Sequence, residues 1–298
     1  MLNIIGGECM SKSNGLSFSA AQLKVIAAAA MLIDHINKVF APFSSYVGFG
    51  YYFSTTMEGI GRIAFPIFVY FVAVGCMKTH DMRRYLLRLL AVGLLSEPFY
   101  DFAFSSFNYM RYTTDPATID NPLIQEWTAH VTLWQGGIQN VCFGLFLGAF
   151  AVFCYQRYRA HSSRHPGRRI LLLVLLIAVW MLLWALAALG QCDYWQTVVP
   201  LAVLLYAVPN EPLRLAVLAV WCAAEYLFLP MGGRMPIEAS PSRAIFYTVM
   251  ALIACALLWR YHGEKGRRPL RKYFFYVFYP GHLLVLGLIR EICILIKF

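Results

Sequence analysis

Two ionisable side chains, Lys24 and His35, lie eleven residues apart in the first apolar segment of the chain. Eleven residues are close to three helical turns and about 16 Å of rise, so both side chains would share one helix face. Ionisable residues at membrane depth are costly and usually face a bundle interior, where they serve function. A neutral imidazole there can act as a general base or carry an acyl group. From the residues alone, an inert hydrogen-bonded histidine is an equally good interpretation.

Further ionisable residues are expected beside His35. Asp34 precedes it directly and is four residues before Lys38, so Asp34 and Lys38 can pair along the helix. Arg62 begins the second apolar segment, four residues before Pro66, a spacing that predicts a kink. We interpret Asp34 as the group that orients His35, and Arg62 as a stabiliser of an oxyanion.

A second group of polar residues lies in the third and last apolar segments. Glu97 and Asp101 fall near the outer end of the third segment and are predicted to counter Arg62. His282 follows Pro280-Gly281 in the middle of the last segment, where the Pro-Gly pair is expected to break helix regularity. His282 is either a packed histidine at a kink or a second polar group that faces the cavity.

Cations gather where the second apolar segment ends and the third begins, at Lys78, Arg83, Arg84 and Arg88. Such a cluster at a helix entrance suits phosphate groups. The alternative is orientation of the helices by basic cytoplasmic loops, which explains Arg88 less well because it lies one turn further into the segment.

The composition indicates a membrane protein rather than a soluble one. The 298 residues are 60% hydrophobic and 13% charged, whereas soluble domains are about 25% charged. The formal charge of +10 is best explained by basic loops, and no basic stretch in a soluble context suggests nucleic acid. Most of the eight cysteines lie in apolar runs without Cys-x-x-Cys spacing, so no metal site is expected.

The apolar runs predict an all-α, polytopic membrane helical bundle formed by one domain, residues 1–298. A span needs about 20 apolar residues. The predicted spans are 21–41, 59–78, 83–104, 135–157, 169–190, 194–209, 212–230, 242–260 and 273–296. The sixth is short, and the sixth and seventh together would also fit one re-entrant hairpin.

Loop charge gives the orientation. If the N-terminus is cytoplasmic, sixteen cations fall in cytoplasmic loops and four on the other side, a strong positive-inside signal that favours nine spans. Residues 1–20 would then be a cytoplasmic N-terminal segment, not a signal peptide, because they lack a basic start and a long apolar core. Residues 105–134 would form the longest outer loop.

The sequence resembles the TraX family of bacterial membrane proteins over about residues 16–290. The stretches that carry the resemblance are LSFSAAQLKVIAAAAMLIDHINKVF, GRIAFPIFVYFVAVGCMKT, YLLRLLAVGLLSEPFYDF, Gln139-Asn140, CDYW and KYFFYVFYPGHLL. The family is associated with N-terminal acetylation of conjugative pilin. It is similar to the acyltransferase-3 group and to the lysosomal heparan acetyltransferase type, which move an acyl group from cytoplasmic acyl-CoA to an acceptor across the membrane.

The resemblance implies a transmembrane acyltransferase in the bacterial cytoplasmic membrane that uses acetyl-CoA. Lys24 and His35 fit the family spacing between a basic or polar residue and an essential histidine. Arg84 and Arg88 are similar to the cations that contact CoA, with Lys78 beside them, although their spacing is one residue longer. The expected partners are membrane lipid and an amine or hydroxyl acceptor on the outer face, such as an envelope glycan or a processed peptide like pilin. The alternatives are a proton-coupled transporter or permease, and a structural or regulatory subunit without chemistry.

Overall fold

The computed structural model describes residues 17–40, 50–112, 139–229, 240–264 and 274–297, without the side chains of 105–112, 294 and 297. In this part of the chain the regular structure is helical, and one isolated bridge joins Phe18 to Tyr261. The helices are α1 (Ala20–Phe40), α3 (Tyr51–Gly61), α4 (Ala64–Lys78), α5 (Met82–Tyr112), α7 (Val141–Arg164), the short 3₁₀ turn η3 (Pro166–Arg168), α8 (Arg169–Leu189), α9 (Val198–Ala207), α10 (Glu211–Phe228), α12 (Pro241–Trp259) and α13 (Phe274–Lys297). The predicted all-α class is confirmed, and every predicted span contains a helix.

Several of the described helices have the length and composition of membrane-crossing segments. Five described stretches are long and apolar enough to cross a bilayer: 51–78, 141–164, 166–189, 241–259 and 274–293. The outermost helix, α8, buries only Leu176, Leu183 and Ala187 and exposes most of its other large apolar side chains, whereas Val179 and Trp180 pack partly against the bundle. A surface of this kind is stable only against lipid, so the chain is an integral membrane protein.

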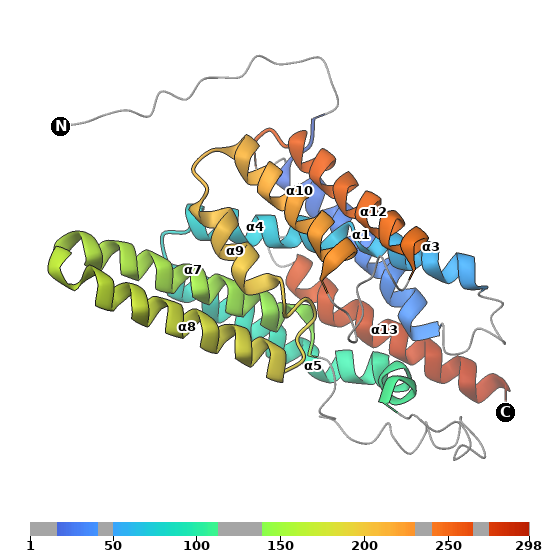
Figure 1. The fold of residues 1–298 in the computed structure, drawn as a ribbon. Helices are drawn as coiled ribbons and strands as arrows, with labels where there is room; N and C mark the ends of the chain where they lie inside the picture. Colours follow the sequence, from blue (N-terminus) through green and yellow to red (C-terminus); the bar gives the residue numbers. More distant parts are fainter. Residues whose placement is uncertain (1–16, 41–49, 113–138, 230–239, 265–273, 298) are drawn as a thin grey trace.

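Helix α4 lies at the centre of the bundle, surrounded by α1, α7, α9 and α12 (Figure 1). Most of its side chains are buried. The helix that precedes it, α3, is separated from it by a break at Arg62–Ile63, where backbone N–H groups bond three residues back instead of four. Pro66 has no N–H to donate, and its ring would crowd the carbonyl of Arg62. The predicted kink is therefore present and leaves Arg62 at a bend.

The helix ends that the topology prediction assigns to one side are in contact. At the predicted cytoplasmic end, the Phe18 N–H donates to the Arg260 carbonyl at 2.9 Å, and Lys78 Nζ lies 3.5 Å from the Gly263 carbonyl. The α7–α8 turn lies at the left end in Figure 1, and the end of α13 lies at the right end. The helices thus run back and forth along one direction.

Two segments differ in length from the prediction. Helix α9 has ten residues, about 15 Å, which is half of a bilayer core, whereas the sixth span was predicted over 194–209. The backbone before it turns through Gln191 and Tyr194, both at positive φ, so the helix begins only at Val198. Helix α5 continues to Tyr112, beyond the predicted start of the outer loop at residue 105. The remainder of that loop, 113–134, lies outside the described residues, as do residues 1–16 of the predicted N-terminal segment.

The Pro-Gly pair in the last segment does not interrupt the helix. Helix α13 runs without a break from Phe274 to Lys297 with Pro280 inside it. It packs along α5 and also contacts α1. This packing carries His282 from the end of the chain to the first helix.

Candidate functional site

The two histidines that the sequence singled out are hydrogen-bonded to each other. His35 Nδ1 on α1 lies 2.8 Å from His282 Nε2 on α13, and the two rings are nearly parallel, at 14°, with centroids 5.0 Å apart. His282 Nδ1 lies 2.9 Å from the carbonyl oxygen of Phe278, one turn earlier on α13. Both histidines are buried, with exposed fractions of 5% and 7%.

These contacts fix the tautomers. A carbonyl oxygen only accepts, so His282 Nδ1 carries the hydrogen and its Nε2 has the lone pair. His35 Nδ1 must then donate to His282, which leaves the lone pair of a neutral His35 on Nε2. The arrangement places a base at Nε2 of His35, oriented through Nδ1 by a second imidazole.

Aromatic side chains hold the histidine pair in place. Phe278 stacks on His282 at 12°, and the edge of Phe104 from α5 meets the His35 ring at 5.1 Å between centroids. Tyr279 contacts both imidazoles. A close-packed aromatic setting restricts both rings to one orientation and excludes water from their flanks.

Asp34 does not orient His35 as we had expected. Its Oδ2 forms an ion pair with Lys38 Nζ at 2.8 Å, which confirms the predicted pair along the helix. The Asp34 side chain lies against Gly61 at the end of α3, so closely that a Cβ at Gly61 would overlap it. Asp34 and His35 thus point to different neighbours, and His282 takes the orienting position.

Arg62 lies near Asp34 and not near His35. Its Nη2 forms an ion pair with Glu58 Oε1 at 2.5 Å, and its Nη1 lies 3.5 Å from the Tyr194 hydroxyl. Its guanidinium lies 4.9 Å from the centroid of the Tyr247 ring, and the Tyr247 hydroxyl donates to Glu58. The counter-charge of Arg62 is therefore Glu58, not Glu97 or Asp101, and the described contacts do not bring Arg62 to His35.

Several buried polar atoms around this ion pair have no hydrogen-bond partner within the described residues. They are Asp34 Oδ1, Asn37 Oδ1, Arg62 Nε, Glu225 Oε2 and the Tyr226 hydroxyl. Buried polar groups are normally satisfied by protein or water. Together with the ion pair they form a polar cluster of residues from α1, α10 and the α3–α4 bend, whose open hydrogen-bond positions suit water or a polar ligand.

Glu97 has a structural role in the described chain. It is fully buried, and its Oε2 accepts hydrogen bonds from the side-chain and backbone N–H groups of Asn140. Asn140 in turn caps α7 by accepting from the Cys142 N–H at 3.0 Å. The buried carboxylate thus joins α5 to the start of α7. Asp101, one turn further along α5, is buried as well.

The predicted CoA-binding cations lie at the surface of the predicted cytoplasmic end. Arg84 is largely exposed and forms an ion pair with Asp81 at 3.0 Å, while Arg88 Nε donates to the Arg84 carbonyl at 3.1 Å. Lys24 is half-buried and lies over the ring of Phe71 at 5.0 Å from its centroid. These cations are accessible to a phosphate, but no described contact links them to His35. Within the described residues, no three His, Cys, Asp or Glu side chains lie together as metal ligands would.

Comparison with known proteins decides the family. The family model described as TraX protein matches residues 19–290, which is most of the chain. The chain belongs to the TraX family. It is also 28% identical over 275 residues to the "Probable fimbrial assembly protein FimC, serogroup H1" of Dichelobacter nodosus, covering 92% of this chain and 96% of that protein. No solved structure matches.

The TraX match includes both histidines and the polar cluster, but some residues of the site were missed by sequence reasoning. Glu58 carries a readable signal, since it is four residues before Arg62 on one helix. Glu225 is recognisable as an ionisable residue inside a predicted span, but its proximity to Arg62 is not. Tyr194 and Tyr247 carry no signal, because they reach Arg62 only through the packing of the helices.

Proposed function

We propose that this TraX-family protein is a transmembrane acyltransferase that moves an acetyl group from cytoplasmic acetyl-CoA to an amine or hydroxyl on the outer face. The observation that carries the proposal is the buried His35–His282 pair, which leaves a lone pair on Nε2 of His35. A general base held in one orientation at membrane depth suits acyl transfer.

The proposed reaction uses this lone pair twice. His35 Nε2 takes the proton of the acceptor nucleophile as that nucleophile attacks the thioester carbonyl. The carbon–sulfur bond then breaks, and the thiolate of CoA receives the proton back from His35. His282 holds the imidazole in the reactive tautomer. Asp34 has no part in this scheme, and Arg62, whose contacts lie in the polar cluster, is not used as an oxyanion donor.

The donor is proposed to bind at the cytoplasmic rim. Arg84, Arg88 and Lys78 supply exposed positive charge, and the start of α5 at Met82 adds the positive end of a helix dipole. Acetyl-CoA carries several phosphate charges, which suits such a cluster. Lys24 lies between this rim and His35 along α1 and would border the path of the pantetheine arm.

The topology that this function requires is nine crossings with the N-terminus in the cytoplasm of a bacterial cell. The sixteen-to-four distribution of loop cations supports it, as do the contacts between helix ends that share a predicted side. In this arrangement α9 enters from the outer side, and the non-helical stretch before it completes the sixth crossing.

The relative named as a fimbrial assembly protein suggests the acceptor class. We propose a processed pilin-like subunit whose N-terminal amine is acetylated during assembly of a surface fibre. An envelope glycan hydroxyl is the other candidate of the same chemistry. A screen of labelled acetyl-CoA with membranes of the source cell would separate peptide from glycan products.

The test of the function is acetyl transfer by purified protein in proteoliposomes. We expect transfer of the labelled acetyl group by the wild type and loss of about two to four orders of magnitude in rate in His35→Ala. Near wild-type transfer in His35→Ala would refute the mechanism. Absence of acetyl-CoA binding in a thermal shift assay would refute the donor.

A proton-coupled transporter is the second candidate, and the polar cluster favours it. Asp34 and Glu225, which are buried, and the partly buried Arg62 have open hydrogen-bond positions and resemble the ionisable groups that line proton paths. A pH-sensitive dye inside the same proteoliposomes distinguishes the two. Solute-driven proton flux without acetyl transfer would support transport.

A further inference from the structure

Two hollows adjoin at the α7–α8–α9 side of the bundle, away from the histidines. One is apolar, measures about 640 Å³ and lies between α8 and α9. The other is polar, measures about 800 Å³ and lies at the α7–α8 turn. Tyr155 lines both. We call them the apolar groove and the polar pocket.

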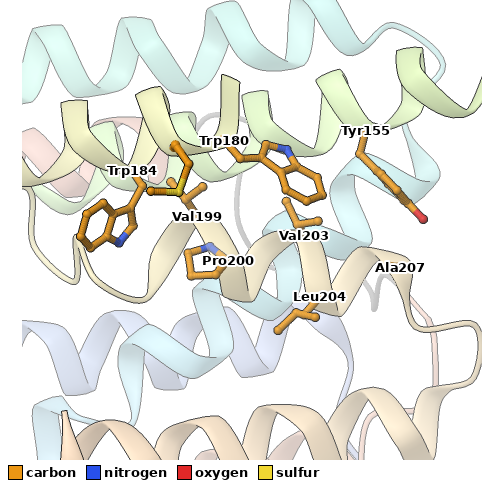
Figure 2. Close-up of a pocket in the computed structure, with 9 residues that line it drawn as sticks. Tyr155, Trp180, Trp184, Val199, Pro200, Val203, Leu204 and Ala207 are labelled. Carbon is orange, nitrogen blue, oxygen red and sulfur yellow. The ribbon is translucent and has the colours of Figure 1, made fainter. Parts of the chain in front are cut away.

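The apolar groove is a product of the short helix α9. Figure 2 shows Trp180 and Trp184 on α8 reaching toward Pro200 and Val203 on α9, with Tyr155 at one end. Trp180 is fixed by a hydrogen bond from its indole N–H to the Ala151 carbonyl at 3.2 Å. Leu204 and Met181 in the lining are exposed, so the groove opens on the surface that faces lipid.

The polar pocket, unlike the apolar groove, is lined largely by polar side chains, and the charged ones among them are positive. Arg159 of α7 and Arg169 of α8 line it from the two sides of the turn, with Ser162, Ser163 and Tyr206 between them, and no Asp or Glu is in the lining. Within the described chain neither guanidinium group donates a hydrogen bond or forms an ion pair, although the Arg159 carbonyl accepts from the Ser162 hydroxyl. Two unopposed guanidinium groups beside hydroxyls favour a phosphate.

From these two neighbours we infer that the α7–α8–α9 side is a binding site for an anionic phospholipid of the cytoplasmic leaflet. The phosphate would lie between Arg159 and Arg169, and an acyl chain would pass Tyr155 and fill the apolar groove. Basic pockets between helices at this membrane surface bind anionic headgroups, and the volumes fall in the range of about 300–1,000 Å³ for ligand sites. Acetyl-CoA fits less well, because an acetyl group leaves the apolar groove empty.

A bound lipid would also stabilise the hairpin. Helix α8 buries few residues of its own, so an acyl chain between α8 and α9 would supply contacts that protein side chains do not. The inference is independent of the acyltransferase proposal, since the site shares no residue with the histidine pair or with the α5 cations.

Native mass spectrometry of the full chain in detergent, titrated with phosphatidylglycerol or phosphatidylcholine, tests the site. We expect phosphatidylglycerol to bind at least about tenfold more tightly, and Arg159→Gln/Arg169→Gln to abolish this preference. The matched control is Arg157→Gln/Arg164→Gln, which removes the same charge from exposed positions of the same hairpin outside the lining, and which should leave the preference unchanged.

Nanodiscs that contain phosphatidylglycerol with brominated acyl chains test where the acyl chain of the bound lipid lies. We expect quenching of tryptophan fluorescence that falls in Trp184→Phe. Equal affinity for the two lipids, equal effects of the two arginine pairs, or unchanged quenching in Trp184→Phe would overturn the inference. Displacement of the lipid by acetyl-CoA would instead make the pocket a nucleotide site.

Discussion

The hydrogen bond between His35 and His282 makes a sharp prediction about substitution of His282. In His282→Ala the buried Nδ1–H of His35 loses its acceptor, which costs about 1–3 kcal/mol. If the lost hydrogen bond destabilises the reactive orientation of the His35 imidazole by this amount, the rate of acyl transfer falls by about 5- to 150-fold. Removal of the base in His35→Ala should cost more, about 10²- to 10⁴-fold.

The matched variant is His282→Gln, because a glutamine oxygen can occupy the place of the imidazole Nε2 and accept from His35. We expect His282→Gln to recover most of the rate lost in His282→Ala, with the effect on kcat rather than on KM for acetyl-CoA. The double variant His35→Ala/His282→Ala should be no slower than His35→Ala, since an orienting group has no effect once the base is absent.

The assay is transfer of labelled acetyl from acetyl-CoA to membranes of the source cell, with the unfolding midpoint of each variant measured in the same detergent. A midpoint close to that of the wild type ensures that a slow variant is folded. If His282→Gln is as slow as His282→Ala while both are folded, acceptance of the His35 hydrogen is not the role of His282. If His282→Ala keeps the full rate, the pair has no catalytic meaning.

Three other predictions follow from the geometry. Arg84→Gln/Arg88→Gln should weaken acetyl-CoA binding at least about a hundredfold in a thermal shift or calorimetric titration, because two charge-assisted phosphate contacts of about 1.5–3 kcal/mol each are lost. Gly61→Ala should lower the free energy of unfolding by about 1–3 kcal/mol, measured by denaturation in detergent, because a Cβ there overlaps the Asp34 side chain. Cysteines placed at 120 and 165 should be labelled from outside the cell and only after permeabilisation, respectively.

Each of these predictions has its own control and contrary outcome. Arg83→Gln removes a neighbouring exposed charge and should leave binding unchanged; equal weakening would mean a general effect of charge. Gly50→Ala places a Cβ where nothing lies within 4 Å and should be neutral, so an equal loss of stability there would contradict the steric argument. The reverse labelling pattern would invert the topology and move the donor site to the wrong side.

Local features of the fold were accessible from the sequence because they depend on spacing along one helix. The Asp34–Lys38 pair follows from a four-residue interval, and the bend at Arg62 from the position of Pro66. The helical segments follow from runs of apolar residues. The late start of α9 does not follow from the sequence. It depends on positive φ at Gln191 and Tyr194, and neither Gln nor Tyr is a residue type that favours positive φ.

The pairing of the histidines was not accessible in the same way. His35 and His282 are 247 positions apart, and only the packing of α13 on α5 and α1 brings them together. The eleven-residue spacing predicts that Lys24 and His35 share a face of α1, but it gives no account of their different neighbours, Phe71 and His282. The sequence therefore identified the candidate base and misassigned the group that orients it.

The hydrogen bond from His282 Nδ1 to the Phe278 carbonyl helps to decide whether the histidine pair works as a base or as part of a proton path. A proton that reached His282 Nε2 would have to leave through Nδ1, but the Nδ1–H points at the Phe278 carbonyl, which cannot carry it onward. Among the described residues no carboxylate forms an ion pair with either imidazole, and the nearest one in sequence, Asp34, is paired with Lys38. A proton taken at His35 Nε2 is therefore neither conducted onward nor stabilised by a counter-ion, and it has to be returned on the same side. Proton exchange at one atom is what acyl transfer to a leaving thiolate requires, and it is the opposite of what a transport path requires.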